Sequence, residues 1–171
     1  MIYSFEHGQL TKIATYRTST APIDISVTGN TITIADLMKS VSVVEYTRGT
    51  SGEPDKLVEV ARHYQIAWST AVAHVDENTY LESDAEGNLM VLHQNLNGVT
   101  ADDRRRLEVT SEMQLGEMVN RIRAISVPTT PNAYVIPRAF MATVGDSPLP
   151  SILSLLTYKP YRSKAHFTSS P

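Results

Sequence analysis

Short runs of alternating apolar and polar residues recur along most of the chain, separated by turn residues. The clearest runs lie at 12–16, 23–27, 31–34, 41–46, 57–60 and 71–75, with tight links at 29–30, 76–78 and 86–88. Successive side chains of a strand point to opposite faces, so this alternation predicts half-buried β-strands. Only residues 100–107 have a helical signature, with Thr100 as the candidate N-cap and two acidic residues in the first turn. This stretch is short enough to form a polar loop instead.

Composition agrees with a single strand-rich domain. Thr, Val, Ile and Tyr make up 52 of the 171 residues, and β-branched and aromatic side chains suit a pleated surface. No apolar run approaches the roughly 18 residues of a membrane span, and the N-terminus has no secretory-signal pattern. The formal charge of −3 argues against a bulk electrostatic grip on nucleic acid. Because the sequence contains no Cys, it has no disulfide framework and no cysteine nucleophile.

An internal repeat with a spacing of about 48 residues is the most informative pattern. A strand ending at Asp36 and the strand that follows it are echoed by a strand ending at Asp84 and its successor. Each pair is preceded by another alternating strand and followed by a longer loop and a fourth strand. A third copy begins at Val119 and reaches Val144. Four short antiparallel strands per repeat are typical of β-propeller blades, although a β-sandwich with similar hairpins is the alternative.

Several motifs occur in an order that resembles a known family. They are the stretch 34–43, the run Val60-Ala61-Arg62 with Trp68 six residues further on, and the stretch 88–91. This series is similar to the C-terminal propeller region shared by three large nuclear scaffolds. These are the large subunit of the damaged-DNA-binding protein, the large subunit of the cleavage and polyadenylation specificity factor, and subunit 3 of splicing factor 3b. Residues 98–104 and 114–120 most resemble the first branch, the adaptor of cullin-4 ubiquitin ligases.

The resemblance covers residues 1–144 and implies an all-β fold. We expect a partial WD40-like β-propeller of about three four-stranded blades, with a ring that is not closed. Family members are far longer, with three propellers and a helical domain, so we interpret this chain as a fragment of that architecture. After Val144 the sequence departs from the family pattern. We expect 145–171 to be a divergent, poorly ordered tail, appended at a gene-model or splice boundary.

The residue types of catalytic and metal sites do not converge in the sequence. We interpret the scattered histidines as surface or edge-strand residues and expect no metal and no cofactor. They are His7, His63, His74, His93 and His166. Asp36 and Asp84 each end a strand, where a carboxylate ordinarily caps backbone N–H groups. No nucleophile elbow or phosphate loop is present, and the Arg104–Arg106 run, flanked by acidic residues, is predicted to form a solvated turn. The sequence predicts no catalytic residue.

Three residues are candidates for partner binding. In the family that this chain resembles, the positions of Arg62, Trp68 and Lys39 lie on the propeller face that receives substrate-receptor proteins. Arg and Trp also dominate the energetics of protein interfaces. For Trp68, a buried anchor between blades is the alternative. Lys39 is the weaker candidate, since Lys cannot reproduce the planar fork that Arg would present there.

We therefore expect a non-catalytic nuclear scaffold that binds proteins. The resemblance implies an adaptor role in a cullin-4 ubiquitin ligase and in damaged-DNA recognition, with substrate receptors as partners and nucleic acid as a further partner reached through a complex. The alternative is a scaffold for RNA processing, of the cleavage or splicing type, that binds nucleic acid. A small stand-alone enzyme is the third hypothesis, and the missing catalytic constellations speak against it.

Overall fold

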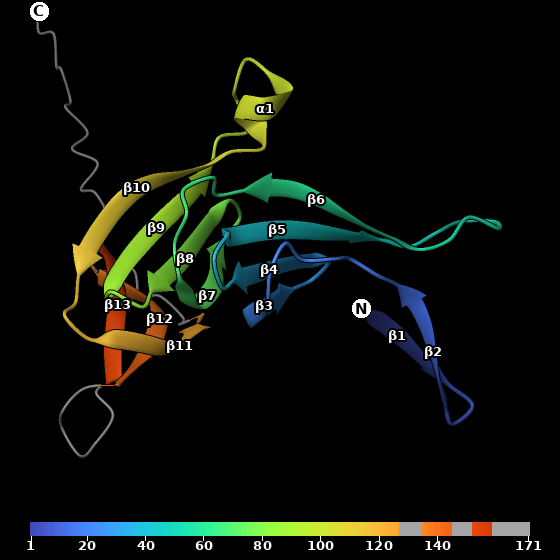
Figure 1. Cartoon of the computed structure of the whole chain (residues 1–171), viewed down its shortest axis with the longest axis horizontal. Coiled ribbons are helices and arrows are strands. Elements are labelled where there is room, and N and C mark those ends of the chain that lie inside the picture. Colours follow the sequence, from blue (N-terminus) through green and yellow to red (C-terminus); the bar gives the residue numbers. More distant parts are fainter. Residues whose placement is uncertain (127–134, 145–151, 159–171) are drawn as a thin grey trace, which may run out of the picture.

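The computed structural model describes residues 1–126, 135–144 and 152–158, most of which form β-strands (Figure 1). The first sheet contains, in spatial order, β3 (Pro22–Thr28), β4 (Thr31–Asp36), β5 (Ser40–Thr47) and β6 (Lys56–Arg62). The second contains β7 (Ser69–Asp76), β8 (Thr79–Asp84), β9 (Asn88–Gln94) and β10 (Leu107–Gln114). The third contains β11 (Met118–Ala124), β12 (Val135–Val144) and β13 (Ile152–Tyr158), and a separate hairpin consists of β1 (Ile2–Glu6) and β2 (Gln9–Ala14).

The sheets are arranged side by side, as blades are in a propeller. Every strand pairs antiparallel with its sheet neighbours, and β7 lies beside both β3 and β11, the first strands of the flanking sheets. The long connection in the first two sheets follows the third strand, as the repeat predicts. The expected fold class is confirmed: the described chain is all-β, with four-stranded antiparallel sheets that do not close and are consistent with partial propeller blades. Within the described residues the third sheet has three strands.

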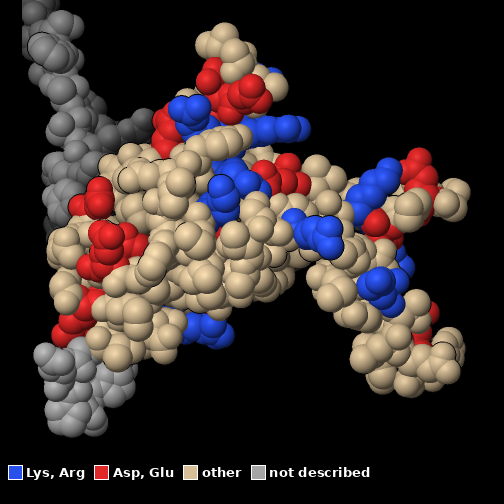
Figure 2. All heavy atoms as spheres, viewed as in Figure 1, with Lys and Arg blue, Asp and Glu red and all other residues tan. Residues whose placement is uncertain are grey.

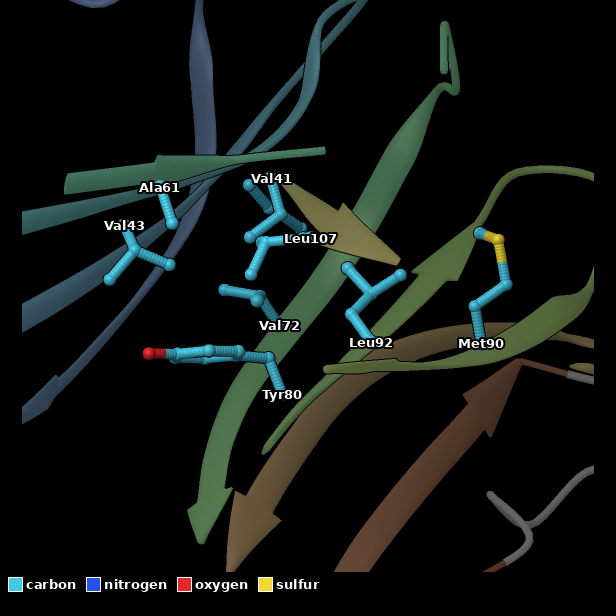
Figure 3. Packing of buried hydrophobic residues seen from close by; sticks show 9 residues of the cluster. Val41, Val43, Ala61, Val72, Tyr80, Met90, Leu92 and Leu107 are labelled. Atoms are coloured by element: carbon cyan, nitrogen blue, oxygen red, sulfur yellow. The ribbon is translucent and has the colours of Figure 1, made fainter. Parts of the chain in front are cut away.

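Two buried apolar layers hold the sheets together. Between the first and second sheets, Val41, Val43 and Ala61 face Val72, Tyr80 and Leu92 (Figure 3). Between the second and third sheets, the buried residues come from alternate positions of the same strands. They are Ala71, Ala73, Leu81, Leu89, Val119, Ile122, Ala139 and Met141. Because neighbouring residues of β7 and β8 serve opposite layers, the second sheet is buried on both faces.

The first and second sheets have the same strand register at equivalent positions of the repeat. Ile25 pairs with Ile34 in the first sheet, and Val72 pairs with Glu82 at the matching place in the second. Each sheet's second strand ends on an aspartate. Asp84 accepts backbone N–H bonds from Glu86 (3.0 Å) and Asn88 (2.9 Å), as predicted, whereas Asp36 accepts from the backbone N–H of Thr20 (2.9 Å) in the segment before β3.

Part of the stretch 100–107 is helical: α1 spans Ala101–Arg104, whereas Leu107 already begins β10. Thr100 is its N-cap, and a reciprocal capping box joins Thr100 to Asp103. Of the expected tail, residues 145–151 and 159–171 lie outside the described residues, as does His166. Ile152–Tyr158 forms β13 and pairs with β12.

Candidate partner-binding site

The three candidate residues lie at one end of the first two sheets. Lys39 is exposed in the β4–β5 turn, Arg62 ends β6, and Trp68 lies just before β7 in the β6–β7 link, residues 63–68. Backbone contacts hold these segments together: the His63 N–H donates to the carbonyl of Val41 (2.9 Å). This contact places the segments that carry Lys39 and Arg62 beside one another. The backbone N–H of Arg62 also donates to the carbonyl of Arg105 (2.8 Å), just before β10, whereas Trp68 lies against the β8–β9 turn.

Trp68 is a surface residue. Its side chain is 59% exposed, so it is not the buried anchor between blades that was the alternative interpretation. Its carbonyl accepts a hydrogen bond from the backbone N–H of Ala85 (2.9 Å), which fixes the residue against the β8–β9 turn. Beside it lies a groove of about 550 Å³, the Trp68 groove. It is lined by Gln65, Ile66, Ala67, Trp68, Asp84, Ala85, Glu86, Asn88, Met90 and Glu112.

The β6–β7 link presents two further large side chains that the sequence analysis did not select. Tyr64 is 58% and Ile66 70% exposed, so these two residues face solvent as Trp68 does. The composition of the link could have indicated these two residues, because an ordinary surface connection is polar. Three large exposed side chains within the five residues 64–68 indicate a contact surface.

Arg62 is engaged within the chain. Its guanidinium pairs with Glu59 (2.5 Å) and reaches the hydroxyl of Ser19 (3.3 Å), while Glu59 also accepts a hydrogen bond from Tyr16. Burial, the largest single influence, acts to lower the pKa of Arg62, but its hydrogen bonds and charge interactions with Glu59 and Tyr16 together outweigh burial and raise the pKa. Burial, followed by the contact with Glu59, raises the pKa of the Tyr16 hydroxyl. Arg62 thus ties the segment before β3 to the end of β6.

Acidic residues border the exposed aromatic surface. Asp84, Glu86 and Glu112 line the Trp68 groove, and no Lys or Arg does. The Asp84 carboxylate is occupied by its own turn, whereas Glu86 and Glu112 are exposed. Figure 2 shows acidic side chains gathered on this face over β10 and its link to β11. The groove therefore favours a positively charged ligand group.

A buried polar cluster lies directly beneath the link. The Glu82 side chain has no solvent exposure, and its carboxylate accepts hydrogen bonds from Ser40 (2.8 and 2.9 Å) and Ser69 (2.5 Å). His63 Nδ1 lies 3.0 Å from Glu82 Oε2 and 2.7 Å from Ser40 Oγ. The interpretation of every histidine as a surface or edge-strand residue is wrong for His63, which is only 4% exposed. Ser40 and Glu82 give the buried Nδ1 of His63 hydrogen-bonding partners between the first and second sheets.

This cluster does not have the geometry of a catalytic triad. A triad places the serine on one ring nitrogen of the histidine and the carboxylate on the other. Here Ser40 and Glu82 share the same nitrogen, Nδ1, and both side chains are buried. The arrangement suits holding two sheets together rather than attacking a substrate. Within the described residues, no group of three His, Asp or Glu side chains could hold a metal ion, and no helix there is long and apolar enough to cross a membrane.

The fold and this surface define a segment of a β-propeller with an exposed aromatic link. The family model for the CPSF A subunit region matches residues 1–154, and the chain belongs to that family. DNA damage-binding protein 1 of Schizosaccharomyces pombe is 34% identical over 147 residues, which is 85% of this chain and 13% of the relative. DNA damage-binding protein 1a of Arabidopsis thaliana is 38% identical over 99 residues, 58% of this chain and 9% of the relative. DNA damage-binding protein 1 of Drosophila melanogaster is 29% identical over 103 residues, 60% of this chain and 9% of the relative. The chain thus matches only a small part of each relative.

Proposed function

We propose that this chain is a propeller segment of a non-catalytic nuclear scaffold, and that the β6–β7 link is where it binds a protein partner. The observation that carries this proposal is the exposure of Trp68 beside a groove, at a position that the family resemblance also indicates. Tyr64 and Ile66 extend the same surface. Large exposed side chains clustered at a groove are typical of interface anchors.

The proposed partners are the substrate-receptor proteins of a cullin-4 ubiquitin ligase. Support comes from the family match and from the relatives, which are named for binding damaged DNA. The acidic lining of the groove favours direct contact with a protein over contact with a phosphate backbone, which would be repelled. DNA would then be reached through the complex. An RNA-processing scaffold is the second candidate, because the family description is that of a CPSF subunit region.

Within this surface Trp68 is the proposed anchor. Its indole and the neighbouring carboxylates would receive an apolar or cationic side chain of the partner. Lys39 is exposed at the edge of the same end and is free to meet an acidic group. Arg62 is proposed as a border contact, since part of its hydrogen-bonding capacity is spent on Glu59 and Ser19.

The test uses a chimaera in which residues 1–126 replace the matching segment of the S. pombe relative. Receptor affinity and the urea midpoint are measured on the same variants: Trp68→Ala, Arg62→Ala, Lys39→Ala and, as a control, Leu96→Ala. Leu96 is 52% exposed, but it lies in the β9–α1 connection at the opposite end of the second sheet. We expect Trp68→Ala to weaken binding by about 2 kcal/mol or more, with an unchanged midpoint and a silent control. Unchanged affinity in all three site variants would reject the proposed surface.

A further inference from the structure

We propose that Glu82 is a positioning residue: its buried carboxylate clamps both ends of the β6–β7 link and so fixes the geometry in which Tyr64, Ile66 and Trp68 are presented. The proposal rests on the proposed function for the role of those side chains, but the clamp itself is a statement about this chain alone.

The two residues that flank the exposed part of the link both meet the same carboxylate. His63 Nδ1 lies 3.0 Å from Glu82 Oε2, and the Ser69 hydroxyl donates to Oε1 (2.5 Å). Each of the three side chains is at most 5% exposed. Between these anchors, residues 65–67 make no hydrogen bond within the part of the chain that the structure describes. The link is therefore held at its ends and free of hydrogen bonds in its middle.

The clamp also spans two sheets. Ser40 and His63 come from the first sheet or its end, whereas Ser69 and Glu82 belong to the second. Ser40 has a φ of 60°, a left-handed conformation that is unfavourable for a serine. That conformation delivers its hydroxyl to Glu82 (2.8 and 2.9 Å). Strained backbone at a buried hydrogen-bonding site indicates a position whose geometry matters.

The repeat sets Glu82 apart from its counterpart in the first sheet. Strand register places Ile34 of the first sheet where Glu82 stands in the second. Ile34 lines an apolar groove on the outer face of the first sheet, whereas Glu82 meets Ser40 and His63 across the interface between the two sheets. A buried carboxylate is costly to desolvate and is weak evidence for stability by itself. A local positioning role accounts for a carboxylate at this interface.

Local order of the link can be measured without a partner. The full chain is compared with Ser69→Ala and Glu82→Gln by amide hydrogen exchange of residues 63–69 and by fluorescence anisotropy of Trp68, the only tryptophan. We expect exchange at 64–68 to rise about tenfold in Ser69→Ala, because a hydrogen bond to a charged group is worth enough to shift a local equilibrium by that factor. The Trp68 anisotropy should fall. Leu92→Ala is the control, since Leu92 is fully buried in the apolar layer of the same interface and is not one of the hydrogen-bonded residues around Glu82. It should lower the urea midpoint while leaving exchange of the link unchanged.

Unchanged exchange and anisotropy in Ser69→Ala would overturn the proposal, even if Glu82→Gln failed to fold. A link that loosens equally in Leu92→Ala would also overturn it, because loosening would then follow global stability. The partner measurement separates the two proposals. If the link loosens while Trp68→Ala leaves receptor affinity unchanged, the clamp stands and the proposed function fails. If the link does not loosen but Trp68→Ala loses binding, the reverse holds.

Discussion

Asp24 and Arg121, which are 97 residues apart in sequence, form an ion pair that joins the first strand of the first sheet to the first strand of the third. The Asp24 side chain is buried, and its other carboxylate oxygen accepts a hydrogen bond from the backbone N–H of Val72 on β7 (3.2 Å). Asp24 on β3 therefore contacts both β7 and β11 and so links the first strands of the three sheets. Arg121 is half exposed, so the pair is buried only on the aspartate side.

Loss of Asp24 should destabilise the whole arrangement of sheets. Asp24→Ala removes an acceptor from a buried backbone N–H and leaves Arg121 without its partner. We expect the free energy of unfolding to fall by about 2 to 3 kcal/mol, measured by urea denaturation. Arg121→Met keeps the hydrogen bond to Val72 but leaves the buried Asp24 carboxylate without its cationic partner, so it should cost at least as much. A clearly smaller loss for Arg121→Met would show that the buried acceptor, rather than the ion pair, carries the contribution.

Trp68 and Leu81 should differ sharply in their effect on stability. Leu81 is fully buried between the second and third sheets, whereas Trp68 is mostly in solvent. Leu81→Ala should lower the free energy of unfolding by about 2 to 5 kcal/mol, and Trp68→Ala should change it by less than about 1 kcal/mol. Urea midpoints of both variants test this. A large loss at Trp68 would mean that the residue acts as a structural anchor after all.

The fold could be predicted because its signals are local and repeated. The alternating runs that carry Ile25, Ile32 and Val44 set strand faces, and the aspartates that end strands mark the turns. The Thr100 capping box was readable for the same reason.

The buried cluster could not be predicted, because its members lie in different sheets. Ser40, His63 and Glu82 meet through strand pairing and sheet packing, and no spacing in the sequence shows it. The repeat held one usable signal: a glutamate aligned with Ile34 is out of place on an apolar face. The exposure of Trp68 could not be predicted either, because it depends on the backbone path of the β6–β7 link, which no pattern in the sequence defines.

Gly87 should tolerate no side chain. It has a φ of 83°, and a Cβ added there would lie 3.1 Å from the backbone nitrogen of Glu117. Gly87→Ala therefore combines backbone strain with a tight contact to the Glu117 backbone, which would have to shift by a few tenths of an ångström, and we expect it to cost more than about 1 kcal/mol. Gly29→Ala is the matched control, because Gly29 also has a positive φ (58°) but nothing lies within 4 Å. Equal urea midpoints for the two variants would contradict a role for the Glu117 backbone.

The α1 capping box should respond to acid. The hydrogen bond with the Thr100 side chain, followed by that with the Thr100 backbone, lowers the pKa of Asp103. A lowered pKa means that the ionised carboxylate is favoured in the folded chain. The stabilisation is therefore present at neutral pH and is lost as pH falls below the ordinary aspartate range of about 3.9.

Carboxyl NMR titration measures this directly. Thr100→Ala should raise the pKa of Asp103 toward its ordinary value by removing the side-chain hydrogen bond, while Thr110→Ala, on β10, should leave it unchanged. An Asp103 titration that is identical in wild type and Thr100→Ala would refute the capping contribution.

The outer face of the first sheet should drive self-association of the isolated 171-residue chain. Ile25, Ile32 and Val44 occupy the register positions that Val72, Tyr80 and Leu92 occupy in the second sheet, where they are buried against a neighbouring blade. In the first sheet they line an apolar groove beside the N-terminal segment, and Ile25 stays 49% exposed. Removing such a face from water is favourable, so we expect concentration-dependent association in light scattering. Ile25→Lys should reduce it, since a charge on that face is costly to bury, whereas Leu10→Lys on the exposed hairpin should have a smaller effect. A chain that stays monomeric at high concentration and unfolds in one cooperative calorimetric transition would show that the open face is tolerated in water.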